Sequence, residues 1–240
     1  MSTLYIVATP IGNLEDLTLR ALRILSEVDL ILCEDTRVTQ KLLNHFNIKT
    51  KTLSYHQHSK LKKIDYILKI LKEGKNLALV SDAGTPGISD PGNKLISKIT
   101  EFTATRPLQI KIVPIPGPSA AITAASISGF PMDKFIFLGF PPAKRKRKKF
   151  FEEVINSKYP VIFYESPYRI IKTLNELKEA YNSSHGFNFT PLKIVVCREL
   201  TKKFETIYRG NISEVIKALE NPPAGEKIKG EFVVIIGGQK

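Results

Sequence analysis

Short apolar runs alternate with longer amphipathic stretches along the first half of the chain. The apolar runs predict strands at Leu4–Ala8, Leu30–Cys33, Leu77–Ser81 and Ile110–Ile115. The stretches between them predict helices at Thr18–Ser26, Arg37–Phe46, Lys60–Glu73 and Pro91–Phe102. The third helix has the clearest pattern, because its apolar residues repeat at helical spacing and Gly74 follows it as a C-terminal cap. Strands that alternate with helices favour a mostly parallel sheet covered by helices.

The pattern changes beyond Pro114–Pro118, a segment dense in proline and glycine. We place a domain boundary there and expect an N-terminal α/β domain over 1–117 and a C-terminal domain over 118–240. The second domain begins with further alternation: strands at Phe135–Leu138 and Val161–Tyr164, and helices at Lys146–Asn156 and Tyr168–Ala180. It then continues with a hairpin, a helix and a last strand, at Lys193–Glu199, Phe204–Arg209, Ser213–Leu219 and Phe232–Ile236. We therefore expect a mixed sheet in the second domain.

Composition adds a strong charge to an otherwise average globular chain. The 240 residues are 42% hydrophobic, which is enough to bury a core and excludes a disordered or low-complexity chain. Lysine and arginine outnumber aspartate and glutamate by 36 to 23, a formal net charge of +13. A compact surface with this charge attracts polyanions. Nucleic acid is the first candidate partner, ahead of an anionic membrane or a polycarboxylate substrate.

The cysteine pattern argues against a disulfide framework and against a zinc site. Cys33 and Cys197 lie in predicted strands, far apart and outside any CxxC motif or Cys/His cluster. We expect two buried free thiols, a reducing compartment and no metal site. The first residues lack the basic and long apolar parts of a signal peptide, and no apolar run approaches the roughly 20 residues of a membrane-spanning helix. We therefore expect a cytoplasmic protein with no membrane partner.

Five turn-rich segments follow predicted strands directly: Thr9–Asn13, Glu34–Arg37, Ser81–Gly92, Pro116–Ala120 and Glu165–Arg169. Ligands of open parallel sheets bind beyond the carboxyl ends of the strands, where such loops present rigid main-chain groups. One loop of this kind is usually an ordinary turn. Five loops at one edge predict a ligand site. The sequence has neither GxxxxGK[ST] nor GxGxxG, which disfavours the common nucleotide-binding loops.

The loops also carry a family resemblance. Thr9–Asn13, Ser81–Gly92, Pro116–Ala120, Phe163–Arg169 and Arg198–Glu205 resemble the S-adenosylmethionine-dependent tetrapyrrole methylase superfamily. Glu34–Arg37 and Tyr55–Ser59 strengthen the likeness to one group within it, whose members methylate a cytidine ribose 2′-hydroxyl in the decoding region of small-subunit ribosomal RNA. The resemblance extends from Leu4 to about Gly237.

The resemblance implies a two-domain α/β tetrapyrrole methylase-like fold, usually a homodimer, with S-adenosyl-L-methionine bound in a cleft between the domains. It also implies that the partner is small-subunit ribosomal RNA or the assembled small subunit. In many relatives the turn after the fourth strand is Gly-Asp-Pro, and here it is Ser81–Gly84, so the group that faces the methyl is left open. The positions that match the donor pocket are Pro10, Ser81, Asp82, Ala83, Gly84, Ser119, Ala120, Tyr164, Glu165, Leu200 and Thr201.

Candidate RNA-binding residues form one run of six consecutive bases: Lys144, Arg145, Lys146, Arg147, Lys148 and Lys149. Six bases in a row would encircle a helix, and their mutual repulsion favours a mobile segment until an anion binds. We favour phosphate binding by this run over the alternative of an inert solvated surface. Tyr55 and Tyr168 lie at strand ends, where they are candidates for stacking on an unpaired base.

Transfer of a methyl group to a ribose hydroxyl requires alignment and removal of a proton. The candidate proton acceptors are Glu34 and His56, and the candidate electrostatic helpers are Lys202 and Arg37. Helix capping by Asp35 or Thr36 is a competing explanation for part of this cluster. His56 and His58 alternate along the chain, but a metal site would need a third ligand that the sequence does not offer.

Two other functions remain open. One is methylation of a tetrapyrrole ring carbon, whose polycarboxylate substrate would also favour a basic protein. The other is a non-enzymatic module that binds RNA or assists ribosome assembly. The six-base run argues against the first, because a small-molecule pocket does not require it. The rigid loops at strand ends argue against the second.

Overall fold

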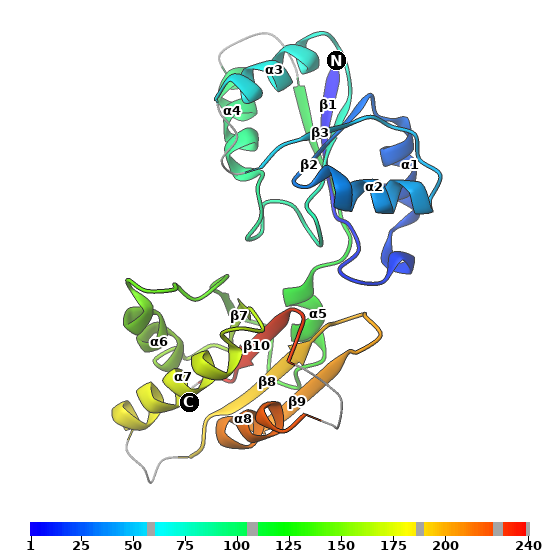
Figure 1. Cartoon of the computed structure of the whole chain (residues 1–240). Coiled ribbons are helices and arrows are strands. Elements are labelled where there is room, and N and C mark those ends of the chain that lie inside the picture. The colour runs from blue at the N-terminus through cyan, green and yellow to red at the C-terminus, as the bar shows by residue number, and fades with distance from the viewer. Residues whose placement is uncertain (57–60, 105–109, 186–189, 223–227, 239–240) are drawn as a thin grey trace. The chain divides into compact units, whose positions relative to one another are not determined.

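The computed structural model describes residues 1–56, 61–104, 110–185, 190–222 and 228–238, and the side chain of residue 185 is not described. The chain divides into two compact units, Met1–Ser119 and Ala120–Lys240. Within the described residues, each unit contains one five-stranded sheet, and Figure 1 shows the ribbon of each unit.

The first unit is built on a fully parallel sheet. Its strands are β1 (Ser2–Val7), β2 (Leu30–Cys33), β3 (Thr52–Ser54), β4 (Leu77–Leu79) and β5 (Ile110–Ile115), in the order β3-β2-β4-β1-β5. The chain reaches each neighbouring strand through a crossover, so all five carboxyl ends lie at one edge. The prediction of a helix-covered parallel sheet is confirmed.

Helices cover both faces of this sheet (Figure 1). The short 3-10 helix η1 (Leu14–Asp16) precedes α1 (Leu19–Glu27), which together with α2 (Thr36–His45) covers one face, whereas α3 (Leu61–Lys72) and α4 (Asn93–Ala104) cover the other. Alternation along β1 explains the two layers: Val7 packs with the α1 side and Leu4 with the α3 side. Both strand faces are buried, as expected for a parallel sheet.

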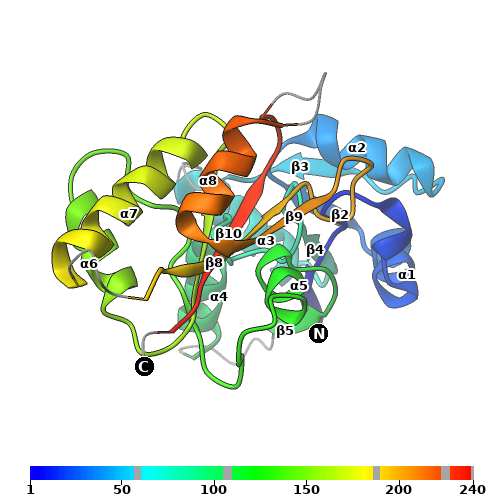
Figure 2. The ribbon, with the colours of Figure 1, turned by 90° about the horizontal axis from the view of Figure 1, so that it is seen from below.

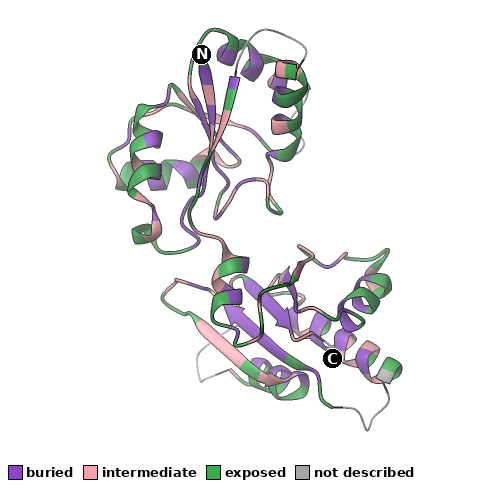
Figure 3. Cartoon of the chain, turned by 180° about the vertical axis from the view of Figure 1, so that it is seen from behind, coloured by how far each residue is buried: buried purple, intermediate pink, exposed green. Residues whose placement is uncertain are grey.

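The second unit has a mixed sheet, also as predicted. Its strands are β6 (Ile136–Phe137), β7 (Val161–Glu165), β8 (Lys193–Arg198), β9 (Thr206–Asn211) and β10 (Phe232–Ile236), in the order β6-β7-β10-β8-β9. Only β6 and β7 pair in parallel, and β8 and β9 form the expected hairpin. Figure 3 shows buried central strands and a half-exposed outer strand.

Helices α6 (Arg147–Ile155), α7 (Ile170–His185) and α8 (Ile212–Glu220) lie side by side on one face of this sheet, where their apolar residues meet Phe163, Val196 and Val234 (Figure 2). Helix α5 (Ala120–Ser126) contacts β7 and β10. The sequence pattern did not predict α5, because this alanine-rich segment lacks an amphipathic repeat. Both cysteines are free and buried, as expected, and burial raises the pKa of the Cys197 thiol to about 11.

Candidate functional site

The turn-rich segments do not all meet at one edge. Thr9–Asn13, Glu34–Arg37, Ser81–Gly92 and Pro116–Ser119 follow the parallel strands of the first unit and therefore share its carboxyl edge. Glu165–Arg169 follows β7, which belongs to the other sheet. The expectation of five loops at one edge was therefore wrong, because a loop sequence does not say which sheet its strand joins.

Hydrogen bonds tie three of these loops into one cradle. Thr9 and Gly84 exchange two main-chain hydrogen bonds, of 2.9 and 3.0 Å. The Thr9 hydroxyl donates to the Ser81 carbonyl at 3.2 Å, and the Thr85 hydroxyl donates to the Pro118 carbonyl at 3.1 Å. Gly84 has a φ of +79°, a conformation that a residue with a side chain adopts at a cost. The strand ends and turn chemistry thus fix the cradle before any ligand is present.

The surface of the cradle consists mainly of main-chain groups and small side chains. Ala83 has a small side chain and is half-buried, whereas Gly84 is buried and its main chain is paired with Thr9. Gly117 lies so close to Ala8 that an added Cβ would approach the Ala8 Cβ at 3.0 Å. The main chain at exposed Asp82 and half-buried Ala83 lies on a rigid loop, and rigid main-chain groups of this kind suit the amine, carboxylate, hydroxyl and adenine edges of S-adenosylmethionine. The residues present fit that group.

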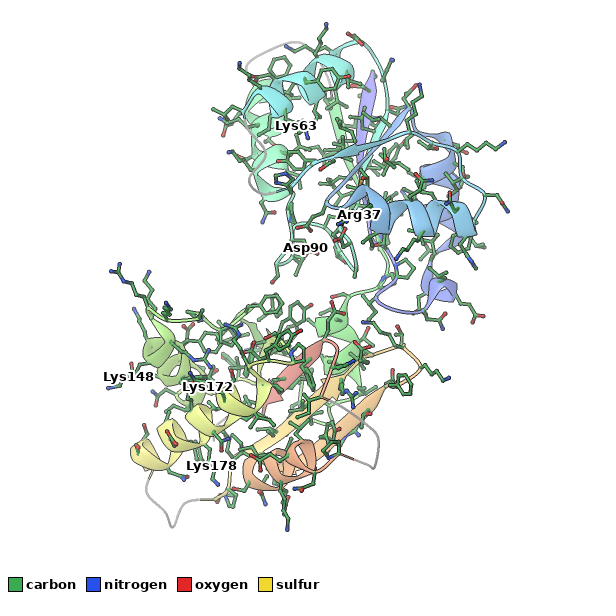
Figure 4. The ribbon with its side chains drawn as sticks, viewed as in Figure 1. Arg37, Lys63, Asp90, Lys148, Lys172 and Lys178 are labelled. Atoms are coloured by element: carbon green, nitrogen blue, oxygen red, sulfur yellow. The ribbon has the colours of Figure 1, made fainter. Side chains whose placement is uncertain are left out.

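A polar hollow of about 540 Å³ opens beside the cradle, at the ends of β2, β3 and β4. It contains three of the four candidate catalytic residues. Figure 4 labels one of them, Arg37, at the beginning of α2. The lining residues are Glu34, Asp35, Thr36, Arg37, Ser54, His56 and Asp82.

Glu34 has the electrostatic setting of a general base. Burial raises the pKa of its carboxyl, and the nearby carboxylates of Asp82 and Asp35 raise it further, whereas His56 opposes the shift. A raised pKa brings a carboxylate closer to the range in which it accepts protons efficiently near neutral pH. The sequence identified Glu34, but the contribution of Asp82 became visible only when β2 and β4 were found to be neighbours.

Asp35 is the N-cap of α2, so helix capping explains the presence of this carboxylate in the cluster. Its carboxylate accepts from the Arg37 main-chain N–H at 2.8 Å and from the Arg37 guanidinium. Hydrogen bonding to Arg37 lowers the Asp35 pKa to about 2. The Arg37 side chain is 87% exposed, so it can exchange this carboxylate for a phosphate.

The two tyrosines at strand ends differ. Tyr55 is 2% exposed and packs in the core between the sheet and α3, so the expectation that it stacks on a base was wrong. Its side chain packs into the apolar layer between the sheet and α3, although the residues of β3 itself are half-exposed. Tyr168 is 95% exposed and remains a stacking candidate. His58 lies outside the described residues.

In the second unit, Tyr164 lies against the beginning of α5. Its hydroxyl accepts from the Ala121 main-chain N–H at 3.2 Å, one residue after Ala120. Its ring makes edge contacts with Phe137 and Phe140. Tyr164 and the first turn of α5 therefore form one local structure.

Glu165 is more deeply buried than its candidate role suggests. The carboxylate side chain is fully buried, and it accepts from the Ser166 main-chain N–H, the Arg169 guanidinium and the Thr173 hydroxyl, at 2.7, 2.9 and 2.6 Å. These partners occupy both carboxylate oxygens. The side chain therefore holds the beginning of α7, and only the main chain of Glu165 remains for a ligand.

Arg147 continues this network into the basic run. Its guanidinium donates to the Thr173 hydroxyl at 2.7 Å and the Pro142 carbonyl at 3.0 Å, and it pairs with Glu176 at 2.6 Å. The other five members of the run, Lys144, Arg145, Lys146, Lys148 and Lys149, are exposed. The run does not encircle a helix as expected, because α6 begins only at Arg147, which anchors the run to α7.

The connection between β8 and β9 holds the remaining candidates. Leu200 is buried, and Glu199 and Thr201 have φ values of 52° and 67°. Such backbone strain persists only where neighbours hold it. Lys202 provides this support by pairing with Glu199 at 2.8 Å and Glu231 at 2.9 Å. Burial opposes the charge of Lys202, but these hydrogen bonds raise its pKa overall, so its ammonium is already neutralised by two carboxylates.

Two kinds of feature are absent from the described residues. No group of three or more His, Cys, Asp or Glu side chains among them is arranged to hold a metal ion. None of the helices in the described part of the chain is long and apolar enough to cross a membrane.

The chain matches the family model of tetrapyrrole (corrin/porphyrin) methylases over residues 3–216. Among curated proteins it is similar to ribosomal RNA small subunit methyltransferase I of Halalkalibacterium halodurans, with 46% identity over 98% of this chain and 76% of that protein. The protein of the same name from Thermotoga maritima is 42% identical over the whole of both chains.

Solved structures share the fold at much lower identity. A cobalt precorrin-4 methyltransferase of cobalamin biosynthesis aligns with a TM-score of 0.66 and 19% identity, over 98% of this chain and 94% of that one. A uroporphyrin-III C-methyltransferase from Thermus thermophilus aligns with a TM-score of 0.61 and 18% identity, over 98% and 94% of the two chains. The family match and the close relatives together show that the chain belongs to the tetrapyrrole methylase family, within the group of ribosomal RNA small subunit methyltransferase I proteins.

Proposed function

We propose that this protein transfers the methyl group of S-adenosyl-L-methionine to the ribose 2′-hydroxyl of a cytidine in the decoding region of small-subunit ribosomal RNA. One observation carries the chemistry: a polar hollow with a carboxylate of raised pKa opens beside a rigid main-chain cradle. The close relatives carry the substrate class, because those at 42–46% identity are named for ribosomal RNA, whereas the tetrapyrrole enzymes share only 18–19%.

The donor residues are proposed separately for each unit. In the first unit they are Pro10 and Ser81, Asp82, Ala83 and Gly84, which lie on or beside the hydrogen-bonded cradle, together with Ser119. In the second unit they are Ala120, Tyr164, the main chain of Glu165, Leu200 and Thr201. When bound, S-adenosylmethionine supplies an electrophilic methyl group on a sulfonium. The residues listed here bind this donor and orient its methyl group.

Glu34 is the proposed proton acceptor. Its raised pKa and its place in the hollow suit the removal of a hydroxyl proton, with His56 beside it as the alternative acceptor. Arg37 is the proposed electrostatic helper, because its exposed guanidinium can hold a substrate phosphate. Lys202 is the weaker candidate for that role, since two carboxylates already neutralise it. Alignment alone supplies part of the roughly 7–11 kcal/mol available from proximity.

RNA binding is assigned to the exposed members of the basic run, Lys144, Arg145, Lys146, Lys148 and Lys149. Figure 4 shows Lys148 extending outward from α6. Tyr168, on the α7 side of the Arg147 network, is placed to stack on an unpaired base. We further propose a homodimer that works in the cytoplasm, on ribosomal RNA or on the assembled small subunit.

Nucleoside mass spectrometry tests the proposal. Small ribosomal subunits that lack the modification are incubated with the protein and S-adenosylmethionine, and their RNA is then digested. We expect a 2′-O-methylated cytidine, absent when either component is omitted. Donor binding by calorimetry without a new nucleoside, combined with methylation of a porphyrinoid, would replace the proposal by tetrapyrrole methylation. RNA binding without donor binding would replace it by a non-enzymatic RNA-binding module.

A further inference from the structure

The second unit contains a second hollow, at the end of its sheet opposite to the candidate donor residues. Its lining comes from the segments that precede β6, β7 and β8 and from Gly237 and Gly238, which follow β10. Tyr164, Glu165 and Leu200 instead lie where β7 and β8 end. With a rise of roughly 3.3 Å per residue, the five residues of β7 separate the two ends by about 13 Å. The hollow is therefore distinct from the candidate donor residues of this unit.

The hollow measures about 830 Å³, within the range of small-ligand sites. Its walls are aromatic and its rim is basic. Phe130, Tyr159 and Tyr181 supply the rings, and Lys134, Lys158 and Lys193 are exposed at the rim beside the single carboxylate Asp133. Aromatic faces with several ammonium groups are the combination that binds a base and its phosphates.

Tyr159 is the centre of this arrangement. The ring is half-exposed, and the ammonium nitrogens of Lys158 and Lys134 lie 5.0 and 5.8 Å from its centroid. A base that stacks on this ring can take over the contact from the lysines, which are then free to meet the adjoining phosphates. In this exchange the ammonium groups of Lys158 and Lys134 give up the Tyr159 ring and gain a phosphate as partner.

The walls are fixed in the absence of a ligand. The Ser157 hydroxyl donates to the Tyr159 carbonyl at 2.8 Å and accepts from its N–H, and the Tyr181 hydroxyl donates to the Thr190 carbonyl at 2.9 Å. A Cβ added at Gly238 would collide with the Lys158 carbonyl, so a glycine is needed for the close packing of the chain behind Tyr159. The site is preorganised, which reduces the entropic cost of binding.

We infer that this hollow binds one nucleotide of a single-stranded RNA segment, with the base stacked on Tyr159 and its phosphates against Lys134, Lys158 and Lys193. The inference rests on the proposed function only in that it takes the RNA substrate as the ligand. It adds a second RNA contact, separate from the basic run. Charge supports RNA over an apolar partner, since three exposed lysines and one aspartate line the hollow.

The test measures binding of a fluorescent single-stranded oligoribonucleotide by anisotropy over a range of salt concentrations. We expect Tyr159→Ala to weaken binding about tenfold, as loss of one stacked base does. We expect the double variant K134E/K158E to weaken binding at least as much and to reduce the slope of log K against log salt by about 0.7 for each lost phosphate contact. The matched control K41E/K217E makes the same charge change at exposed lysines of α2 and α8. It should retain affinity to within about threefold.

Donor binding by calorimetry and the oligomeric state are measured on each variant, so that misfolding is recognised. Wild-type protein that methylates RNA, with Y159A and K134E/K158E binding RNA no more weakly than the control, would overturn the inference and leave the proposed function standing. A change in oligomeric state for Y159A alone would also overturn it, because the hollow would then be an interface between copies. Wild-type protein that binds no RNA would overturn the proposed function and the inference together.

Discussion

The two units handle their charged residues in opposite ways. In the first unit, Glu34 lies in an open hollow at the sheet edge, where burial and the nearby Asp82 and Asp35 carboxylates raise its pKa. In the second unit, Glu165 is fully buried and both of its oxygens are occupied. A carboxylate of raised pKa at an open edge suits proton transfer, whereas a fully hydrogen-bonded carboxylate in a core suits the positioning of its neighbours. The first unit therefore has a carboxylate of raised pKa at its open edge, whereas the second uses a buried carboxylate to hold the beginning of α7.

The largest expected effect tests the structural side of this contrast. Glu165→Gln removes the negative charge that pairs with Arg169. It also replaces one carboxylate oxygen by an amide N–H₂, which cannot accept the hydrogen bonds that the Arg169 guanidinium and the Thr173 hydroxyl donate. Breaking a buried pair on one side costs about 3 kcal/mol. We expect the unfolding free energy of the second unit, measured in urea, to fall by about that amount. Glu153→Gln, at an exposed position of α6, should leave it within about 0.5 kcal/mol.

Resolved by hydrogen exchange, the loss in Glu165→Gln should be confined to the second unit. Equal loss of hydrogen-exchange protection in both units would show that they unfold together. Glu165 would then not act on the second unit alone, contrary to the contrast between the two units.

The next effect tests the reactive side. Glu34→Gln keeps the size of the side chain and removes its capacity to accept a proton, so we expect kcat to fall about 100-fold, equivalent to about 2.7 kcal/mol. Donor affinity and stability should change little, because Glu34 is only half-buried. Glu73→Gln, at an exposed carboxylate after α3, is the matched control. Full activity of E34Q under saturating substrates would move the acceptor role to His56.

Arg147 and Lys148 are neighbours in the basic run, and we expect their substitution to have different effects. Arg147→Ala should lower the unfolding free energy of the second unit by about 2 kcal/mol, since three partners lose their donor and Glu176 is partly exposed. Lys148 is 93% exposed, so Lys148→Ala should leave stability unchanged and reduce the salt slope of RNA binding by about 0.7–0.9. The reverse assignment of the two effects would show that Arg147, not Lys148, contacts RNA.

The smallest effect is a shift in pH dependence. Burial and the Asp82 and Asp35 carboxylates raise the Glu34 pKa, and a base works only above its pKa, so the acid limb of kcat should lie above the ordinary carboxyl value of 4.5. Asp82→Asn removes one repulsive charge and keeps the oxygen that accepts from the Asp35 N–H at 3.1 Å. In this variant the acid limb of the kcat profile should move to lower pH, and kcat at pH 7 should change by less than threefold. An unmoved limb would assign it to another group.

Much of the fold could be predicted from the sequence, because it depends on local patterns. Alternation of apolar runs and helical repeats gave both sheets, and the short link between β8 and β9 gave the hairpin. Glu34 and Asp82 lie 48 residues apart in sequence, and only the pairing of β2 with β4 shows that they interact. Strand order arises from tertiary packing that no local pattern records.

The individual roles of charged residues were harder to predict, for a related reason. Arg147 and Lys148 are adjacent and chemically alike in the sequence, yet one is held by three partners and the other is solvated. The difference depends on the phase of α6 relative to α7. Similarly, Tyr55 and Tyr168 both follow predicted strands, yet Tyr55 is buried in the core and Tyr168 is 95% exposed.

The place of β10 in its sheet has a consequence for synthesis. The strand lies between β7 and β8, yet it follows both of them in sequence. A nascent chain therefore exposes two unpaired strand edges until Phe232–Ile236 has emerged from the ribosome. Exposed edges of this kind invite aggregation and attract proteases. A chain truncated anywhere before Phe232 lacks the central strand that pairs with β7 and β8. Such a product is a target for proteases, and the second unit becomes stable only when translation has passed this strand.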